Sequence, residues 1–282
     1  MSDIGFLDGH FMPLEEVRIS PDDRGYQFGD GVYEVVMVYR GIPCLLRDHL
    51  SRLEHSARGI RLTLPYTPFE WEKRILEGVE RSGYQYCKIY IQVTRGIVPR
   101  EHLFPSQCVP TVFMSFRRTP PLDRNLQQQG VKVMTLPDLR WGRCDIKSLN
   151  LLPNVLAKQQ AKEAGAFEAI FIRDGVVTEG TSCNVMIVRN GVIHTPKTNH
   201  HILAGVTRKI LLDLARKEGL SVEERTVEAK DLLDLDEMFL AGTTIEVMPV
   251  IAIDEKPVGT GKPGPFTQKL SASYQDFLAH LV

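Results

Sequence analysis

Strand-like runs and helix-like runs alternate along the whole chain, and this alternation is the feature that most constrains the fold. In residues 48–60, apolar side chains recur at the spacing of one helix face, with Asp48 in the place of an N-cap. Further helices are predicted at residues 68–81, 152–164, 205–218 and 266–281. Strands are predicted at residues 5–7, 10–12, 32–39, 42–46, 88–94, 111–116, 131–135, 167–173, 184–188, 238–241 and 247–253, and near Val222. The elements follow no fixed repeat, so we expect mixed α/β domains.

A stiff polar segment divides this pattern into two parts. Residues 117–125 contain Pro120-Pro121 and three arginines, which is typical of a linker between domains. A chain of 282 residues is long enough for two modest domains. We therefore expect one α/β domain in residues 1–120 and a second in residues 121–282.

Composition favours small molecules as partners and disfavours nucleic acid and membranes. The formal net charge at pH 7 is −1, which gives no electrostatic reason for binding a polyanion or an anionic membrane surface. No window approaches the roughly 18 to 20 apolar residues of a membrane span. The five cysteines form no Cys-x-x-Cys pair, which argues against both a disulfide framework and a zinc site. A reducing compartment fits best, so a cytoplasmic protein is predicted.

Two features that look like motifs are weak candidates for binding sites, one for a nucleotide and one for a metal ion. The glycine-rich run from Arg24 to Gly31 matches neither G-x-G-x-x-G nor a P-loop, so we interpret it as a tight turn that leads into the strand at residues 32–39. The adjacent His200 and His201 would point to opposite faces of an extended segment, and so could not easily bind one metal ion. No G-x-S-x-G motif marks a serine nucleophile. No metal is predicted.

Lys147 is the main candidate for chemistry. It follows Ile146, lies just ahead of a predicted helix, and is followed by the segment Glu-Gly-Thr-Ser-Cys-Asn at residues 179–184. Partial burial would favour the neutral amine, which is the nucleophilic form and can make a Schiff base. The alternative is a surface lysine that extends its ammonium into water.

Three further features could bind anions. Gly205, Val206 and Thr207 open a helix, where free N–H groups suit a phosphate, although plain helix capping is the alternative. Thr243-Thr244, just after a strand, has the same two interpretations. Arg100 and His102 lie two residues apart in a loop and could together bind a carboxylate, or could be solvated charges.

Several separate motifs together resemble one enzyme family. Residues 145–152, 178–184 and 203–208, with the run Asp-Arg-Gly-Tyr-Gln-Phe-Gly-Asp-Gly-Val-Tyr-Glu-Val from Asp23, closely resemble the fold-type IV pyridoxal phosphate enzymes, and within them the D-amino acid aminotransferases. The resemblance spans nearly the whole chain. It implies pyridoxal 5'-phosphate as cofactor, a smaller N-terminal α/β domain, a larger C-terminal α/β pseudo-barrel domain that carries the Schiff-base lysine, and a homodimer.

The resemblance also implies roles for the catalytic and cofactor-binding residues. Lys147 would bind the cofactor as a Schiff base and then carry the proton of the substrate α-carbon. Glu179 would lie beside the pyridine nitrogen and keep it protonated. The phosphate and the ring would be held by a further set of residues. These are Arg52, Leu203, Val206, Thr207 and Thr243.

The substrate site is implied in the same way. Tyr33, Arg100 and His102 match the group that receives the substrate α-carboxylate, and Tyr90 would line the same pocket. Fixing the carboxylate on one side of the cofactor decides which α-hydrogen faces Lys147, so the trio would select D over L substrates.

The resulting hypothesis is transamination between D-amino acids, such as D-alanine and D-glutamate, and 2-oxo acids, such as pyruvate and 2-oxoglutarate, by a ping-pong mechanism. The alternatives of the same fold are an aminodeoxychorismate lyase, which Arg100 and His102 disfavour, a branched-chain L-aminotransferase and an amine transaminase. A non-catalytic protein that binds pyridoxal phosphate is the alternative from another class.

Overall fold

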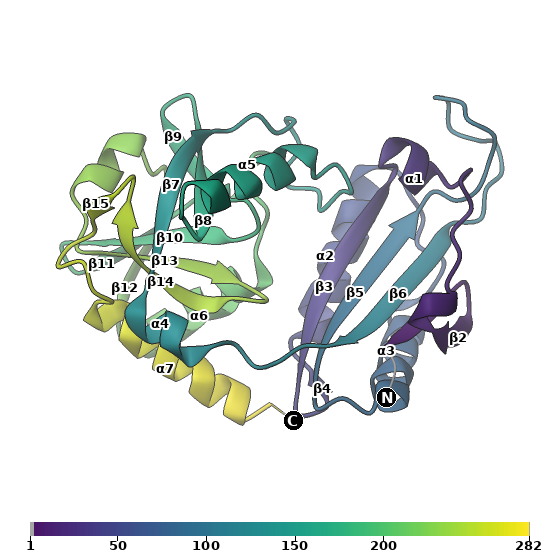
Figure 1. Ribbon diagram of the computed structural model, residues 1–282, viewed down its shortest axis with the longest axis horizontal. Helices are drawn as coiled ribbons and strands as arrows, with labels where there is room; N and C mark the ends of the chain where they lie inside the picture. Colours follow the sequence, from purple (N-terminus) through teal and green to yellow (C-terminus); the bar gives the residue numbers. More distant parts are fainter. Residues whose placement is uncertain (1–2, 282) are drawn as a thin grey trace. The chain divides into compact units, whose positions relative to one another are not determined.

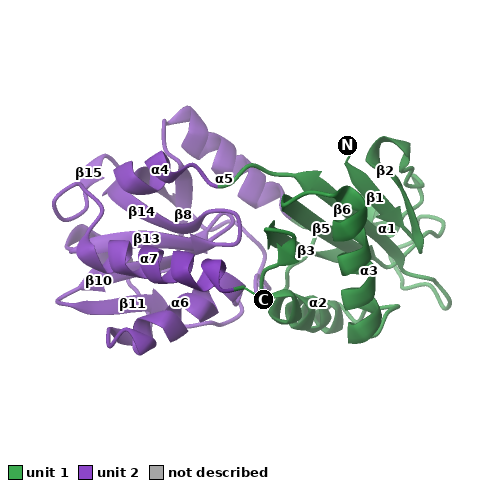
Figure 2. Cartoon of the chain, turned by 90° about the horizontal axis from the view of Figure 1, so that it is seen from below, with its two compact units in different colours: residues 1–121, 146–150, 281–282 green, residues 122–145, 151–280 purple. Residues whose placement is uncertain are grey.

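The chain divides into two compact units (Figure 2). The computed structural model describes residues 3–281. The first unit contains the residues up to Pro121 together with Ile146–Asn150 and Leu281, and the second contains Leu122–Asp145 and Leu151–His280. The predicted mixed α/β fold class is confirmed, with one sheet in each unit.

The segment Ile146–Asn150 differs from the expected domain assignment. The sequence places it with residues 121–282, whereas the structure places it in the first unit, while the main division at Pro121 lies close to the expected boundary. Tyr33 N donates to Lys147 O at 3.0 Å, and Ile146 is buried in the core of the first unit. These contacts outweigh position along the chain, so Lys147 belongs to the first unit.

Within the described residues, the first unit contains a six-stranded antiparallel sheet in the order β2-β1-β6-β5-β3-β4 (Figure 1). The strands are β1 (Ile4–Leu7), β2 (His10–Pro13), β3 (Gly31–Tyr39), β4 (Ile42–Pro43), β5 (Tyr86–Thr94) and β6 (Thr111–Arg118). The strands predicted at residues 5–7 and 10–12 form one hairpin, and those predicted from residues 32 and 42 form another. Their turns place Asp8-Gly9 and Arg40-Gly41 at positive φ, as primed turns require. The strand expected at residues 42–46 ends at Pro43, because Leu45 turns left-handed and begins the next helix.

Helices α2 (Leu46–Gly59) and α3 (Pro68–Ser82) pack on this sheet, α2 against β3 and α3 against β1 and β6. Asp48 lies in the first turn of α2, so its expected role as N-cap is wrong. The start of α3 is fixed by a capping box between Thr67 and Glu70, and Gly83 ends it at φ 66°. Burying apolar side chains such as Leu53 and Ile75 contributes about 1.5 to 3 kcal/mol each.

The glycine-rich run is helical where a plain turn was expected. Residues Arg24–Phe28 form the short helix α1, and the Asp23 carboxylate accepts from Gly25 N at its start. Gly29, at φ 66°, ends the helix and redirects the chain into β3. A short 3₁₀ helix, η1 (Leu14–Glu16), follows β2.

The second unit contains a mixed nine-stranded sheet that forms a half-barrel over the described residues. Its strands are β7 (Val131–Pro137), β8 (Glu168–Arg173), β9 (Val176–Gly180), β10 (Asn184–Arg189), β11 (Val192–Pro196), β12 (Ser221–Arg225), β13 (Glu237–Gly242), β14 (Glu246–Ile253) and β15 (Lys256–Pro257). The main path runs β12-β11-β10-β13-β14-β7-β8-β9, and β15 pairs with β14. Strands β9, β11 and β15 are absent from the sequence-based prediction, because short strands are specified by their pairing partners more than by their own residues.

The helices of the second unit lie on this sheet (Figure 1). They are α4 (Arg124–Gln129), α5 (Leu152–Glu163), α6 (Val206–Lys217), η2 (Ala229–Leu233) and α7 (Pro265–Ala279). Helix α5 packs on β7 and β8, whereas α6 and α7 contact each other and β13. The expected linker at residues 117–125 is shorter, since β6 extends to Arg118 and α4 begins at Arg124. Over residues 3–281, no helix combines the length and the apolar composition that crossing a membrane requires.

Candidate functional site

Lys147 is held by its backbone, while its side chain extends over an aromatic ring. Its N–H donates to Ser56 Oγ on α2 at 3.1 Å, and its carbonyl accepts from Tyr33 N on β3. The half-buried side chain places Nζ 4.2 Å from the centre of the Tyr33 ring. Among residues 3–281, the Lys147 amine makes no hydrogen bond or ion pair. Its position is therefore restricted, while its nitrogen stays available to react.

A buried carboxylate and an arginine lie on the elements that hold Lys147. Glu34, on β3, is fully buried and accepts from Arg52 Nε at 2.6 Å, Arg52 Nη2 at 2.9 Å and His49 Nδ1 at 2.8 Å. Burial raises the pKa of Glu34, but the Arg52 charge and the His49 hydrogen bond outweigh it and lower the pKa to about 2. Burial lowers the pKa of His49 below its ordinary value. We call Tyr33, Glu34, His49, Arg52 and Lys147 the lysine cluster.

Two tyrosines extend this cluster along the sheet. The rings of Tyr33 and Tyr90 lie on neighbouring strands with centroids 5.7 Å apart, and Tyr90 Oη donates to Gln92 Oε1 at 2.7 Å. Burial, with the nearby Tyr33, raises the pKa of Tyr90. The phenol of Tyr90 is therefore a neutral hydrogen-bonding group at physiological pH.

Arg100 and His102 lie together around another ring. Both are exposed on the loop between β5 and β6, with the Arg100 guanidinium 4.3 Å above the Phe28 ring and the His102 ring 5.4 Å from it. Tyr33 lies instead with Lys147 and Tyr90. Across residues 3–281, no hydrogen bond, ion pair or ring contact joins Tyr33 to Arg100 or His102.

Glu179 is fixed in the second unit by donors from three segments. Its carboxylate, 6% exposed on β9, accepts from Arg140 Nη1 at 2.5 Å, Asn184 Nδ2 at 3.2 Å and Leu203 N at 3.1 Å. Asn184 Nδ2 also donates to Leu203 O at 3.0 Å, which ties the Leu203 backbone to β10. One oxygen thus binds the guanidinium and the other binds two amides.

Arg140 is a candidate site residue that the sequence prediction missed. Its guanidinium binds Asp138 through Nε and Nη2, each at 2.9 Å, as well as Glu179. Burial raises the pKa of Asp138, but the hydrogen bond from Arg140 outweighs it and the pKa is lowered. The polar residues Asp138 and Arg140, which lie two apart directly after strand β7, were the available signal. We call Asp138, Arg140, Glu179, Asn184 and Leu203 the glutamate cluster.

The start of α6 has the features of an anion site. Gly205 is the N-cap and provides no side-chain cap, while Val206 and Thr207 are buried in the first turn. A Cβ at Gly205 would lie 1.9 Å from Asn184 Oδ1, so only glycine fits there. Thr243 is half-buried in the turn that follows β13.

The two adjacent histidines have separate polar partners. His200 Nδ1 lies 3.6 Å from Asp145, and His201 Nδ1 lies 2.9 Å from Arg173 Nη1. Within residues 3–281, no group of three or more His, Cys, Asp or Glu side chains is arranged to hold a metal ion.

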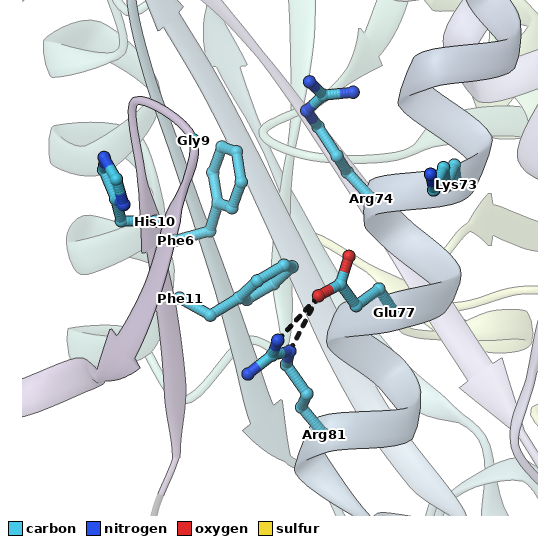
Figure 3. A pocket seen from close by; sticks show the side chains of 8 residues that line it. All are labelled: Phe6, Gly9, His10, Phe11, Lys73, Arg74, Glu77 and Arg81. Carbon is cyan, nitrogen blue, oxygen red and sulfur yellow. Dashed lines mark hydrogen bonds and ion pairs between the residues drawn. The ribbon is translucent and has the colours of Figure 1, made fainter.

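Two cavities of the first unit contain none of the predicted site residues. One, of about 420 Å³, lies between the β1–β2 hairpin and α3 (Figure 3). Figure 3 shows the Phe11 ring beside the ion pair of Glu77 and Arg81 on α3. The other, of about 640 Å³, is lined by α2 and α3 residues including Leu50 and Trp71.

Comparison with known sequences identifies a family and several relatives. The model of the family described as amino-transferase class IV matches residues 31–253. The D-alanine aminotransferase of Bacillus licheniformis is 44% identical over 96% of this chain and 95% of the relative. The D-alanine aminotransferase of Listeria monocytogenes serotype 4b (strain F2365) is 41% identical over 98% of this chain and 95% of the relative.

Solved structures with the same fold are also aminotransferases. The branched-chain aminotransferase from the thermophilic archaeon Thermoproteus uzoniensis, solved with norvaline, has a TM-score of 0.88 and 28% identity, covering 98% of this chain and 94% of that one. The fold IV-transaminase CpuTA1 from Curtobacterium pusillum has a TM-score of 0.83 and 27% identity, covering 99% of this chain and all of that one.

Proposed function

The chain belongs to the amino-transferase class IV family, and we propose that it is a pyridoxal 5'-phosphate-dependent enzyme that transfers amino groups between D-amino acids and 2-oxo acids by a ping-pong mechanism. D-alanine and D-glutamate are the expected donors, and pyruvate and 2-oxoglutarate the expected acceptors. The observation that carries this proposal is the match to D-alanine aminotransferases at about 40% identity over nearly the whole chain.

The residues present fit the cofactor. The Lys147 amine has no hydrogen-bond or ion-pair partner among residues 3–281, which suits a group that must form a covalent bond. The glutamate cluster offers a fixed carboxylate for a protonated ring nitrogen. The N-terminus of α6 offers backbone N–H groups that the side chain of its N-cap residue, Gly205, does not cap, which suits a phosphate.

Lys147 is the proposed nucleophile and proton carrier. When bound, pyridoxal phosphate supplies an electron sink that acidifies the Cα–H bond of the amino acid. Lys147 Nζ takes that proton and later returns one, and the Tyr33 ring beneath it limits the positions that the amine can adopt. The fixed backbone of Lys147 keeps the loss of freedom small when the amine reacts.

Glu179 is proposed to hold the pyridine nitrogen in its protonated form. Arg140 and the two amide donors stabilise its negative charge, and Asp138 balances the charge of Arg140. The carboxylate is therefore held in place and remains an acceptor. A neutral partner at the same position would leave the ring a weaker electron sink.

The phosphate and the ring plane are assigned to the remaining cofactor residues. Val206 and Thr207 provide N–H groups and a hydroxyl at the start of α6, with Thr243 as a further donor. Arg52 adds a cation whose orientation Glu34 fixes. Leu203 provides an apolar side chain on a backbone that Glu179 and Asn184 hold.

The substrate α-carboxylate is assigned to Tyr33, Arg100 and His102, with Tyr90 lining the same pocket. A cation, an imidazole and a phenol are suitable donors for a carboxylate. Because they fix one face of the substrate, they decide which α-hydrogen meets Lys147. This selection is the proposed origin of the preference for D-amino acids.

A homodimer in the cytoplasm is part of the proposal. Five free thiols fit a reducing compartment. Light scattering gives the mass in solution, and a monomer of the 31.9 kDa chain would contradict the dimer. Fractionation of the native host with antibody detection tests the location.

The decisive experiment compares enantiomers. Purified holoenzyme is mixed with D-alanine or L-alanine, and its visible absorption is followed. D-alanine should bleach the band within one half-reaction, and 2-oxoglutarate should then restore it. Bleaching by L-alanine alone would contradict the assignment to D-amino acids.

A branched-chain L-aminotransferase is the second candidate, because the solved neighbours include branched-chain aminotransferases at 28% identity. L-leucine as donor tests it in the same assay. A lyase of this fold would release pyruvate from its substrate and would show no amino-group transfer to 2-oxoglutarate.

A further inference from the structure

The loop that carries Arg100 and His102 is attached through its residues 96–103 to the segment around α1. This loop, residues 95–110, connects β5 to β6. Arg24 N donates to Gly96 O at 3.0 Å, Val98 N donates to Asp22 O at 3.2 Å, and Asp23 forms a bridge with Ile97. The first residues of the loop are thus hydrogen-bonded through their backbone to the α1 segment.

Arg24 continues this attachment to the residues beside His102. Its side chain is buried, and Nη1 donates to the carbonyls of Glu101 at 2.5 Å and Leu103 at 3.3 Å. These are the two neighbours of His102 in the chain. Nε of the same guanidinium binds Asp30 at 2.8 Å, so one buried cation connects the start of β3 to both sides of His102.

Asp30 is held from a second side. Arg95, at the start of the loop, binds Asp30 through Nε at 2.8 Å and Nη2 at 3.0 Å, and also donates to the carbonyls of Ile60 and Arg61. The Phe104 ring lies 3.7 Å from the Arg95 guanidinium. Both ends of the stretch from Arg95 to Phe104 are therefore attached to the first unit.

Phe28 supports the two exposed side chains. The Arg24 guanidinium lies 4.9 Å from its ring centre and the Arg100 guanidinium 4.3 Å, with the His102 ring at 5.4 Å. Arg100 Nη1 also donates to Gln27 O at 3.2 Å. An exposed arginine and histidine would otherwise sample many rotamers.

We propose that Arg24 and Phe28 are positioning residues that hold His102 and Arg100 ready to bind the substrate α-carboxylate. This inference rests on the proposed function, because it takes the carboxylate-binding role of His102 and Arg100 from it. Arg24 fixes the backbone on both sides of His102, and Phe28 restricts both side chains. The α1 segment is thus a specificity element that does not itself touch the substrate.

The test uses Arg24→Lys in the holoenzyme. Lysine keeps the cation beside Asp30 but lacks the fork that donates to Glu101 O and Leu103 O as well. KM for D-alanine should rise about tenfold, as expected for one lost charge-assisted hydrogen bond. Because the lysine and glutamate clusters are untouched, kcat should change little, and the preference for D-alanine over L-alanine should fall.

Hydrogen exchange provides a readout that does not depend on activity. Amides of residues 96–104 should exchange faster in Arg24→Lys than in the wild type, with α2 and α3 unchanged. Arg18→Lys is the matched control, because Arg18 is exposed and donates only to the carbonyls of Glu15 and Val17 in its own segment. It should match the wild type in both measurements.

Phe28→Leu is the second variant. It tests the same role if Arg24→Lys does not fold. It should raise KM for D-alanine with the same small change in kcat. In a His102→Ala background the effect of Arg24→Lys should shrink, because both changes act on the same contact. Equal KM values for wild type, Arg24→Lys and Phe28→Leu, or full additivity with His102→Ala, would overturn the positioning role.

The outcomes also separate this inference from the proposed function. A wild-type holoenzyme that does not bleach with D-alanine contradicts the function itself. A wild type that bleaches, with variants that keep its KM and its exchange rates, contradicts only the role of Arg24 and Phe28.

Discussion

The lysine cluster and the glutamate cluster each hold a buried glutamate against an arginine, but the partners of the glutamate come from different numbers of elements. Glu34 on β3 is bound by His49 and Arg52, which lie one turn apart on α2. Glu179 on β9 is bound from the segment after β7, from β10 and from the segment before α6. The first arrangement needs one strand and one helix, whereas the second needs most of its unit to be folded.

Because of this difference, we expect replacements of Lys147 and of Arg140 to affect different properties: the reaction in the first case and the stability of the fold in the second. In the lysine cluster the amine of Lys147 has no ion pair among residues 3–281, so replacing it should affect the reaction and little else. In the glutamate cluster Arg140 lies between two buried carboxylates, so replacing it should affect the unit as a whole.

Lys147→Ala should cause the largest change, a loss of transamination of about 10²-fold to 10⁴-fold or more, because the proton carrier is removed. The assay measures pyruvate formed from D-alanine and 2-oxoglutarate. The unfolding temperature of the apoenzyme should stay near that of the wild type. Lys73→Ala, an exposed lysine on α3, is the control. Unchanged amino transfer in Lys147→Ala would contradict the role of Lys147 as nucleophile and proton carrier.

Arg140→Met should lower the free energy of unfolding by about 3 to 5 kcal/mol, because Asp138 and Glu179 lose a buried partner. Chemical denaturation of the apoenzyme measures the change. Arg143→Met is the control, since Arg143 pairs with Asp145 at the surface. Equal stability of the two variants would mean that the glutamate cluster is no more cooperative than a surface pair.

Glu34→Gln should remove part of the acid sensitivity of the fold. The Glu34 carboxyl has an ordinary pKa of 4.5 and a folded pKa of about 2, a difference that corresponds to about 3 kcal/mol. Since the folded pKa is depressed, this stability is present above pH 4.5 and is lost as the pH falls towards 2.

Unfolding measured from pH 7 to pH 2 should therefore show the wild type and Glu34→Gln converging in acid. Glu77→Gln, whose carboxylate pairs with Arg81 at the surface, should keep the wild-type pH dependence. A constant gap between wild type and Glu34→Gln over this range would show that the charge of Glu34 is not what stabilises the cluster.

Ser56→Ala should have the smallest effect, about 1 kcal/mol, because the Lys147 N–H loses its acceptor. Thermal unfolding measures it, with the exposed Ser51→Ala on the same helix as control. A larger loss for Ser51 than for Ser56 would contradict the view that α2 fixes the backbone of Lys147.

Sequence patterns predicted the elements that are specified locally. Helices α3 and α6 have apolar periodicity with clear end residues, and Gly83 and Gly219 mark their ends at positive φ. The lysine cluster depends on such elements, since the periodicity of residues 48–60 already places Arg52 and His49 on one helix. Sequence could not reveal their pairing with Glu34, because that contact joins two elements.

The contacts of the glutamate cluster could not be predicted from the sequence. Arg140 lies in an irregular segment without periodicity, and its partner Glu179 is 39 residues away along the chain. Strand β9, which carries Glu179, was missed because its five residues gain their regular structure by pairing with β8. Long-range pairing decides both cases, and no local pattern encodes it.

The chain passes from the first unit to the second and back again, and this order has a consequence during synthesis. Residues 146–150 belong to the first unit, yet 24 residues of the second unit, Leu122–Asp145, precede them. As the chain leaves the ribosome, the first unit lacks the partner of Tyr33 N and the Ile146 side chain of its core until those residues emerge. A nascent chain stalled after residue 121 should be more sensitive to protease than one stalled far enough on to expose residue 150. Lys147, the residue proposed to carry the chemistry, thus lies in a segment of the first unit that is synthesised after part of the second unit.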